Sequence, residues 1–207
     1  MHILASTSGI ISEQNDAIDL CQSPGDIVIL SAADSDLACL SAAFQRLEPG
    51  KRSLRLANLL QLNHNLSVDL YIEKTLCHAR LIIIRLIGGR NYWLYGLSEI
   101  EAVAKKFDIR LVVIPGDDKP DLELTSYSTV SPEITERFWM YFTHGGIDNA
   151  LNLLIYANSI LGDKESWKEP APLLKAGFYW PPIDLPSFLD IEKCWIPERS
   201  VILITFY

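Results

Sequence analysis

The sequence predicts an α/β protein with a doubly wound, mostly parallel, flavodoxin-like sheet. Short apolar segments rich in β-branched residues recur through residues 1–115. Amphipathic segments of helical length separate them, and glycine, proline or serine turns bound them. Strands that alternate with helices in this way are joined by right-handed crossovers, so the sheet is parallel. We expect the strand order 2-1-3-4-5, followed by a helical hairpin and a proline-rich extension into a second domain.

Residues 1–130 form the predicted sheet domain, and each of its strands is a short apolar or alternating segment that ends near a turn residue. The fourth strand has an apolar run too short for a helix and stops at Gly88-Gly89. This pattern is typical of a strand that is buried on both faces. In order, the expected strands are 2–6, 26–31, 52–58, 81–87 and 109–114.

The helices between the strands are predicted from their apolar stripes and their start signals. A short helix is expected at 15–21 and a longer one at 34–47. Ser67 is expected to cap the next helix. Ser98, with Glu101 three residues later, has the form of a capping box, and an amphipathic stripe follows it.

Residues 131–168 are expected to form a helical hairpin that packs on the sheet or on a neighbour. Ser131 followed by Pro132 is a strong start signal for its first helix, and the glycine pair after His144 ends that helix. The second helix is predicted at 148–161, with Tyr156 on a different face from the buried stripe. That stripe consists of Leu151, Leu154, Ile155 and Leu161.

Residues 169–207 are rich in proline and have the composition of a linker. A strand is expected at 175–180, and the apolar stretch at 201–207 has the pattern of a buried strand. A native chain seldom ends inside its most apolar stretch, because the exposed strand edge invites aggregation. We therefore expect the chain to be a fragment in which residues 201–207 open a second α/β domain.

Charge and hydropathy argue against two classes of partner. The 207 residues carry a net charge of −8 and no cluster of Lys and Arg, which argues against nucleic acid. No stretch approaches the roughly 18 consecutive apolar residues of a membrane span. The amino terminus lacks the basic region of a signal peptide. The cysteines are far apart and form no C-x-x-C pair, which favours a reducing, cytoplasmic location; they are Cys21, Cys39, Cys77 and Cys194.

The loop after the fourth strand is the best candidate for a binding site, because open α/β sheets place ligands at the carboxyl ends of their strands. Two glycines let backbone N–H groups point at an anion, an arginine can clamp a carboxylate, and aromatic faces can stack on a flat ring. The alternative is that the glycines only permit a turn and the rings only fill the gap between loop and helix. The candidate substrate-binding residues are Gly88, Gly89, Arg90, Tyr92, Trp93 and Tyr95.

No catalytic residue is predicted from the motifs. The chain contains no G-x-G-x-x-G, G-x-S-x-G, Walker loop or H-E-x-x-H motif. His144 lies at a predicted helix end, where a histidine often complements the helix dipole. A metal-binding role would need His144 to lie beside Asp148 or another carboxylate, so these two residues are the metal candidates. The residues by themselves thus predict a binding domain without catalytic machinery.

Several stretches together resemble one family, the large subunits of aerobic cobaltochelatase (CobN), within the wider group that includes the large subunit of magnesium chelatase. The glycine, tyrosine and tryptophan stretch is the most specific of them. The family's subunit is several times longer, and this chain is similar to its amino-terminal portion. The stretches that carry the resemblance are Ala17–Leu20, Asp26–Leu37, Arg55–Leu62, Ser67–Tyr71, Ile87–Gly96, Pro115–Asp118 and Gly145–Tyr156.

The resemblance implies a role in cobalamin biosynthesis. The family's full subunit binds hydrogenobyrinic acid a,c-diamide and cobalt, and two partner subunits of the AAA+ type hydrolyse ATP to drive Co²⁺ into the corrin ring. Cobalt and ATP are then used by the full complex, and neither is expected to bind this stretch alone. A peripheral carboxylate of the corrin precursor would bind at Gly88, Gly89 and Arg90, while Trp93 or Tyr95 would lie against the ring.

Two other functions remain open at this point. The chain is also compatible with the large subunit of magnesium chelatase, which handles protoporphyrin. It is equally compatible with a non-catalytic interaction module, whose apolar hairpin docks against the remainder of its own subunit or against the AAA+ subunits.

Overall fold

The computed structural model describes residues 17–48, 50–172, 176–183 and 186–196, together with Arg199, Ile202 and Ile204. These residues belong to two compact units, with the boundary between Ala171 and Pro172. The first unit contains the sheet and all of the candidate site residues, and the second is a short segment with one helical turn.

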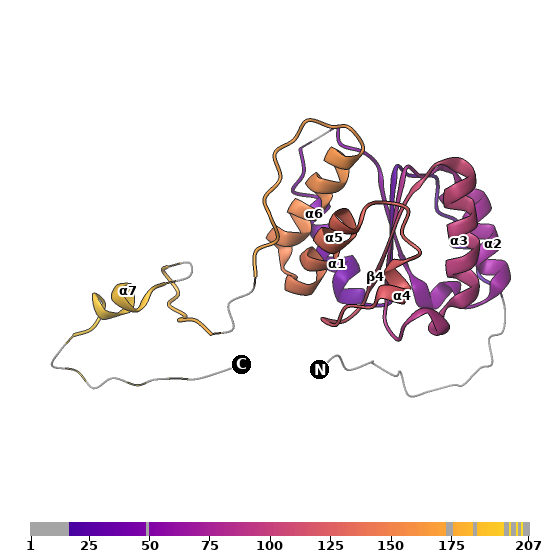
Figure 1. Cartoon of the computed structure of the whole chain (residues 1–207). Coiled ribbons are helices and arrows are strands. Elements are labelled where there is room, and N and C mark those ends of the chain that lie inside the picture. Colours follow the sequence, from indigo (N-terminus) through magenta and orange to yellow (C-terminus); the bar gives the residue numbers. More distant parts are fainter. Residues whose placement is uncertain are drawn as a thin grey trace. The chain divides into compact units, whose positions relative to one another are not determined.

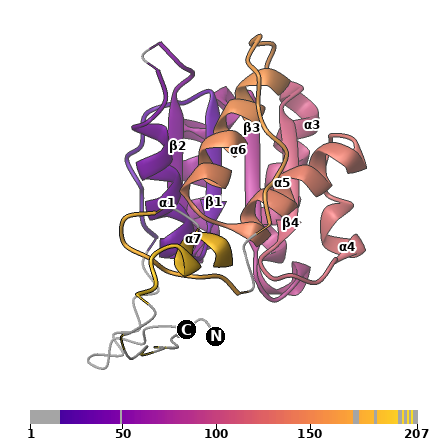
Figure 2. The same ribbon diagram turned by 90° about the vertical axis from the view of Figure 1, so that its left-hand side faces the viewer.

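The first unit is built on a four-stranded parallel sheet, which confirms the predicted α/β class (Figures 1 and 2). The strands are β1 (Ile27–Ser31), β2 (Leu54–Asn58), β3 (Leu81–Leu86) and β4 (Arg110–Pro115). Every residue of β1 and β3 is buried. Continuous apolar strands are therefore covered on both faces, as expected for a parallel sheet between two helical layers.

The strand order is β2-β1-β3-β4, which differs in one respect from the prediction. The predicted strand at 2–6 lies outside the described residues. Because that segment was counted as the first strand, the prediction placed 26–31 at the edge and 52–58 beside 81–87. The structure instead places β1 between β2 and β3, which explains its complete burial. Counted from β1, the four strands follow the flavodoxin-like order 2-1-3-4.

Helices cover both faces of the sheet (Figure 1). One layer contains α1 (Asp34–Phe44), α5 (Pro132–His144) and α6 (Ile147–Ile160). The other contains α2 (Asn65–Lys74) and α3 (Leu94–Phe107). The predicted hairpin of α5 and α6 packs on the sheet, because its buried side chains share one apolar cluster with those of the strands. Short turns complete the unit: η1 (Leu59–Leu62), η2 (Leu76–His78), η3 (Arg90–Tyr92) and α4 (Leu122–Thr125).

Two predicted helix starts are wrong. Helix α2 begins at Asn65, where His64 Nδ1 accepts the N–H of Leu66 at 3.1 Å. Ser67 lies inside that helix, and its buried hydroxyl oxygen accepts the N–H of Ile18 at 2.7 Å. Helix α3 begins four residues before Ser98, at Leu94. Each serine has the composition of a cap, but tertiary contacts determine where the helix begins.

The ring of Tyr156 on α6 is buried, although the sequence placed it outside the buried stripe of that helix. The chain returns over the hairpin after α6, and Trp167 lies edge-on to Tyr156 with ring centroids 4.7 Å apart. Arg137 of α5 stacks on both rings and donates two hydrogen bonds to Glu169. This returning segment covers a second face of α6, which the apolar periodicity of the helix does not reveal.

The second unit contains α7 (Phe188–Glu192), which starts with a capping box between Ser187 and Asp190. Two ring pairs, Phe178 with Phe188 and Phe188 with Trp195, form a small aromatic cluster. The predicted strand at 175–180 is not formed by its described residues, of which Trp180 makes one isolated bridge to Ile183. Of the predicted strand at 201–207, only residues 202 and 204 are described, and neither is in a strand. Among the described residues of the chain, no helix has the length and apolar content needed to span a bilayer.

Candidate functional site

A cleft of about 440 Å³ opens at the carboxyl ends of β3 and β4. This is the edge at which parallel α/β sheets bind ligands. One wall is the loop after β3 and the other is the loop that leads from β4 to α4. The Gly116 N–H donates to the carbonyl of Leu86 at 2.8 Å and joins the two loops at their base. The lining residues are Leu86, Gly88, Gly89, Pro115, Asp117, Lys119, Pro120, Asp121 and Leu122.

Gly88 and Gly89 both have positive φ, +90° and +73°, so any other residue is strained at these positions. A Cβ on Gly88 would meet the ring of Tyr92 at about 3.6 Å, and one on Gly89 would meet Asp121 Oδ2 at 3.6 Å. Among the described residues, no acceptor binds the N–H of either glycine. These two N–H groups of the first wall therefore have no protein acceptor among the described residues.

Arg90 directly follows the lining residue Gly89 and faces Glu123, which directly follows the lining residue Leu122; we call the position of this pair the mouth of the cleft. Its Nε is 2.9 Å from Glu123 Oε1, and the two side chains are 43% and 61% exposed. Tyr92 is 54% exposed beside Gly88. The cleft and its mouth thus contain two glycines, an arginine and one exposed aromatic ring from the predicted set.

The structure does not place Trp93 where its ring could stack on a ligand, as the stacking hypothesis requires. Its side chain is only 6% exposed, and its indole N–H donates to the carbonyl of Leu62 at 2.9 Å. The ring packs so closely under α3 that a Cβ on Gly96 would lie 2.2 Å from it. Trp93 therefore fills the gap between η1 and α3, which is the alternative that the sequence left open, and its faces are not available to a ligand.

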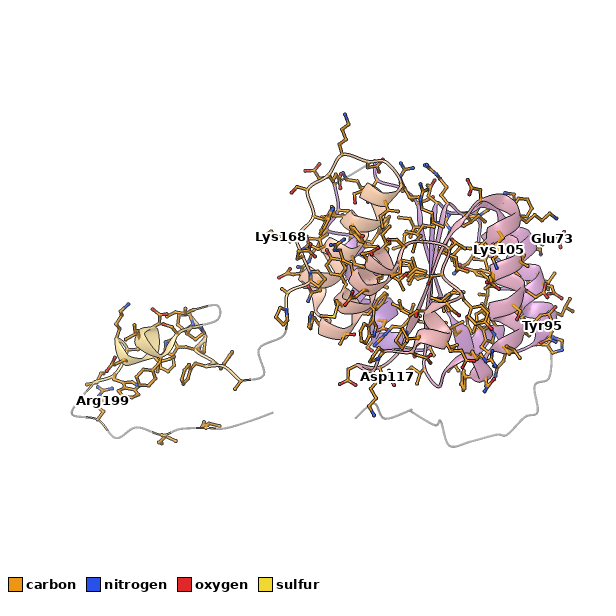
Figure 3. The ribbon with its side chains drawn as sticks, in the orientation of Figure 1. Glu73, Tyr95, Lys105, Asp117, Lys168 and Arg199 are labelled. Carbon is orange, nitrogen blue, oxygen red and sulfur yellow. The ribbon has the colours of Figure 1, made fainter. Side chains whose placement is uncertain are left out.

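Tyr95 is exposed but is engaged outside the cleft. Its hydroxyl donates to Asp69 Oδ1 of α2 at 2.7 Å, and this hydrogen bond raises the pKa of Tyr95 to about 12. Figure 3 shows Tyr95 and Asp117 at the same end of the sheet domain, on different elements. The hydrogen bond joins the start of α3 to α2. Tyr95 thus stabilises the loop after β3 without lining the cleft.

The second wall carries charges that sequence reasoning did not include in the site. Asp121 Oδ1 accepts the N–H of Leu124 and caps α4, while Asp117 Oδ1 accepts the N–H of Lys119. Just beyond α4, Ser128 and Thr129 bind the backbone of β4, which holds this wall against the sheet. The acidic turn at the end of the β4 sequence was a usable signal, because the ends of neighbouring parallel strands meet at one edge.

A buried arginine under the cleft also escaped prediction. Arg85 of β3 donates to Asp36 of α1 and, at 2.7 Å, to the carbonyl of Gly116. Its guanidinium lies over the ring of Phe142, 5.4 Å from the centroid. Asp36 accepts a further hydrogen bond from the hydroxyl of Ser31 at 2.7 Å. Arg85 thereby holds Gly116, which lies between the lining residues Pro115 and Asp117.

The two metal candidates are not brought into a shared site. His144 ends α5, and Asp148 lies in the first turn of α6 with its carboxylate almost fully exposed. Asp148 faces Arg46 of α1, with Nη1 and Oδ1 3.8 Å apart. Within the described ranges, no group of three His, Cys, Asp or Glu side chains is placed to hold a metal ion.

Fold and site together define a parallel α/β domain with a cleft at the carboxyl edge of its sheet. The chain is 46% identical over 181 residues to the aerobic cobaltochelatase subunit CobN of a Sinorhizobium species. It is 37% identical over 208 residues to the CobN of Pseudomonas aeruginosa. These matches cover 87% and 100% of this chain, but 14% and 17% of the relatives. This chain is therefore related to a portion of the CobN subunit.

The fold agrees with this relationship. The catalytic subunit of cobaltochelatase from Mycobacterium tuberculosis matches with a TM-score of 0.57 and 26% identity. The match covers 75% of this chain and 12% of that one. No protein-family model matches the chain. The resemblance read from the sequence to CobN is thus confirmed, and the chain spans about a sixth of the length of these curated relatives or less.

Proposed function

We propose that this chain forms part of a cobaltochelatase large subunit and contributes to the ATP-dependent insertion of Co²⁺ into hydrogenobyrinic acid a,c-diamide. The observation that carries this proposal is the 46% identity to a CobN subunit over 87% of the chain. Because the chain spans only 14% of that relative, we assign metal insertion to the remainder of the subunit and ATP hydrolysis to AAA+ partner subunits. The relatives are cobaltochelatase subunits, which favours cobalt over magnesium.

Within that role, the cleft is the proposed contact with the corrin precursor. The free N–H groups of Gly88 and Gly89 and the guanidinium of Arg90 can bind a peripheral carboxylate, because charge-assisted hydrogen bonds to a carboxylate are strong. The exposed ring of Tyr92 is available to lie against the apolar edge of the macrocycle. Trp93 and Tyr95 are assigned to supporting the loop, since one is buried and the other is bound to Asp69.

A chimera tests the role of the chain as a whole. The 181 matched residues of the Sinorhizobium CobN are replaced by this chain, and cobalt insertion is measured with the partner subunits present. We expect the chimera to insert cobalt and a deletion of the same stretch to fail. A folded chimera that assembles with its partners but does not insert cobalt would contradict the proposal.

A second, compatible function is favoured by the second unit, which exposes large apolar side chains. Trp180, Phe188 and Trp195 are all more than a third exposed although they belong to a short helical and turn segment. We propose that residues 176–183 and 186–196 pack against the remainder of a CobN-length polypeptide, most of which lies outside this chain. Hydrogen exchange tests this, since these amides should be protected in the full-length subunit and unprotected in this chain. The cytoplasmic location remains a prediction that rests on the widely spaced cysteines.

A further inference from the structure

Arg90 and Glu123 connect the two walls of the cleft at its mouth. Arg90 follows the glycine pair of the first wall, and Glu123 follows Leu122 of the second. A ligand carboxylate that binds through the Nε of Arg90 must therefore compete with the carboxylate of Glu123. The chain supplies its own anion at the position where a ligand anion is expected.

The geometry of this ion pair differs from that of two bidentate arginine pairs in the first unit. Arg52 donates two aligned hydrogen bonds to Asp163, and Arg137 donates two to Glu169. Arg90 approaches Glu123 to 2.9 Å, but none of its N–H groups is aligned for a hydrogen bond to any described residue. Glu123 therefore does not bind Arg90 in the bidentate geometry that is preferred between arginine and a carboxylate.

The pair is also weak. Both side chains are well exposed, and exposed ion pairs contribute about 0.2–1 kcal/mol. A ligand carboxylate that binds Arg90 in the bidentate geometry and also accepts from the glycine N–H groups gains more than the loss of Glu123 costs. When the ligand carboxylate replaces that of Glu123, the positive charge of Arg90 remains paired with a negative charge.

We infer that Glu123 acts as an internal substitute for the ligand carboxylate, which occupies Arg90 and is displaced from it when a carboxylate-bearing ligand enters the cleft. The inference rests on the proposed function, since it takes the cleft to be a carboxylate site. Glu123 then sets the affinity and selectivity of the site: a ligand without a well-placed carboxylate does not displace it. Glu123 is a positioning residue for Arg90 and needs no contact with the ligand.

The test is an absorbance titration of this chain with hydrogenobyrinic acid a,c-diamide. Glu123→Gln should tighten binding by up to about fivefold, which corresponds to the energy of an exposed ion pair. Arg90→Ala should weaken binding by about tenfold or more, and Glu123→Gln should have no effect when Arg90 is absent. Glu101→Gln is the matched control, because it removes a similar exposed pair with Lys105 on α3 and should leave the affinity unchanged.

These outcomes distinguish the inference about Glu123 from the proposed carboxylate site. If Arg90→Ala weakens binding but Glu123→Gln binds no tighter than the wild type, the inference is wrong and the carboxylate site stands. If the wild type does not bind, or if Arg90→Ala leaves the affinity unchanged, the proposed site itself is wrong. A gain from Glu123→Gln that persists without Arg90 would also overturn the inference, because it would reflect general charge repulsion.

Discussion

Arg85 and Arg90 lie five residues apart on the same strand and loop, and both face a carboxylate. Arg85 is 9% exposed and contacts Asp36, the Gly116 carbonyl and the Phe142 ring. Arg90 is 43% exposed and is paired only with Glu123 among the described residues. The first arginine joins α1, β3 and α5 below the cleft, whereas the second lies across the mouth of the cleft.

The difference shows how burial determines the role of an ion pair. Removing one partner of a buried pair leaves an uncompensated charge in a medium of low polarity, which costs several kcal/mol. Removing one partner of an exposed pair leaves a charge that water solvates, which costs little. The buried pair therefore cannot exchange partners without loss of the fold, and the exposed pair can. This contrast predicts how each group responds to substitution.

The largest effect is expected at the buried arginine. Arg85→Leu leaves Asp36 with only the Ser31 hydroxyl as partner and should lower the free energy of unfolding by about 3–5 kcal/mol, measured by urea denaturation. The double variant Arg85→Leu with Asp36→Leu should be less destabilised than the single one, because no lone buried charge remains. A loss below about 1 kcal/mol in the single variant would break the contrast with Arg90.

The packing that supports the loop should give the next largest effect. Alanine normally stabilises a helix interior relative to glycine by about 1 kcal/mol. In Gly96→Ala, however, the new Cβ would lie 2.2 Å from the Trp93 ring, so we expect a net loss of about 1–2 kcal/mol in urea denaturation.

Ser98→Ala is the matched control for this change, two residues further along α3. Ser98 lies inside the helix rather than at its start, so the substitution should leave the stability unchanged within about 0.5 kcal/mol. A loss of about 1 kcal/mol would instead indicate a helix cap at Ser98 and would contradict the position of Trp93.

Sequence reasoning succeeded where the local pattern and the tertiary structure agree. The run around Ile82 to Ile84 predicted a strand buried on both faces, and Ser131-Pro132 with the glycine pair after His144 predicted the bounds of α5. It failed where a distant contact decides the outcome. Ser98 has the form of a cap, but the burial of Trp93 against Leu62 places the start of α3 earlier.

Only part of the candidate site could be predicted, because the rest of it depends on contacts between distant residues. Gly88 and Gly89 need positive φ, and this requirement can be recognised in a glycine pair at a strand end. The second wall with Glu123 follows a different strand, β4, which was correctly predicted beside β3, but the approach of Glu123 to Arg90 depends on side-chain positions in two loops, which the sequence pattern does not report. The role of Trp93 depends on the burial of its ring, and that of Tyr95 depends on its hydrogen bond to Asp69. The periodicity of the sequence reports neither.

At the mouth of the cleft, the expected effect on stability is small. Arg90→Ala and Glu123→Gln should each change the free energy of unfolding by less than about 0.5 kcal/mol in urea denaturation, although both change ligand affinity. This separation of stability from binding sharpens the contrast with Arg85. If either substitution cost about 2 kcal/mol, the pair would be a structural contact and the site would not exchange carboxylates.

The smallest effect on stability is expected for the exposed pair of Tyr95 and Asp69, and it should be visible in a pH titration. The hydrogen bond to Asp69 raises the pKa of Tyr95 to about 12. Tyrosine in an unfolded chain has a pKa of about 10, so the contribution of this contact is fully present below that pH and is lost as the pH rises through about 12.

In Asp69→Asn the negative charge is absent, and ultraviolet absorbance of tyrosinate should show one ring ionising at lower pH than in the wild type. Tyr95→Phe should remove that ring from the titration, which separates it from buried Tyr71 and Tyr141, whose pKa values burial also raises. If the curves of the wild type and Asp69→Asn coincide, the hydroxyl of Tyr95 is not held by Asp69 and is free to serve the cleft.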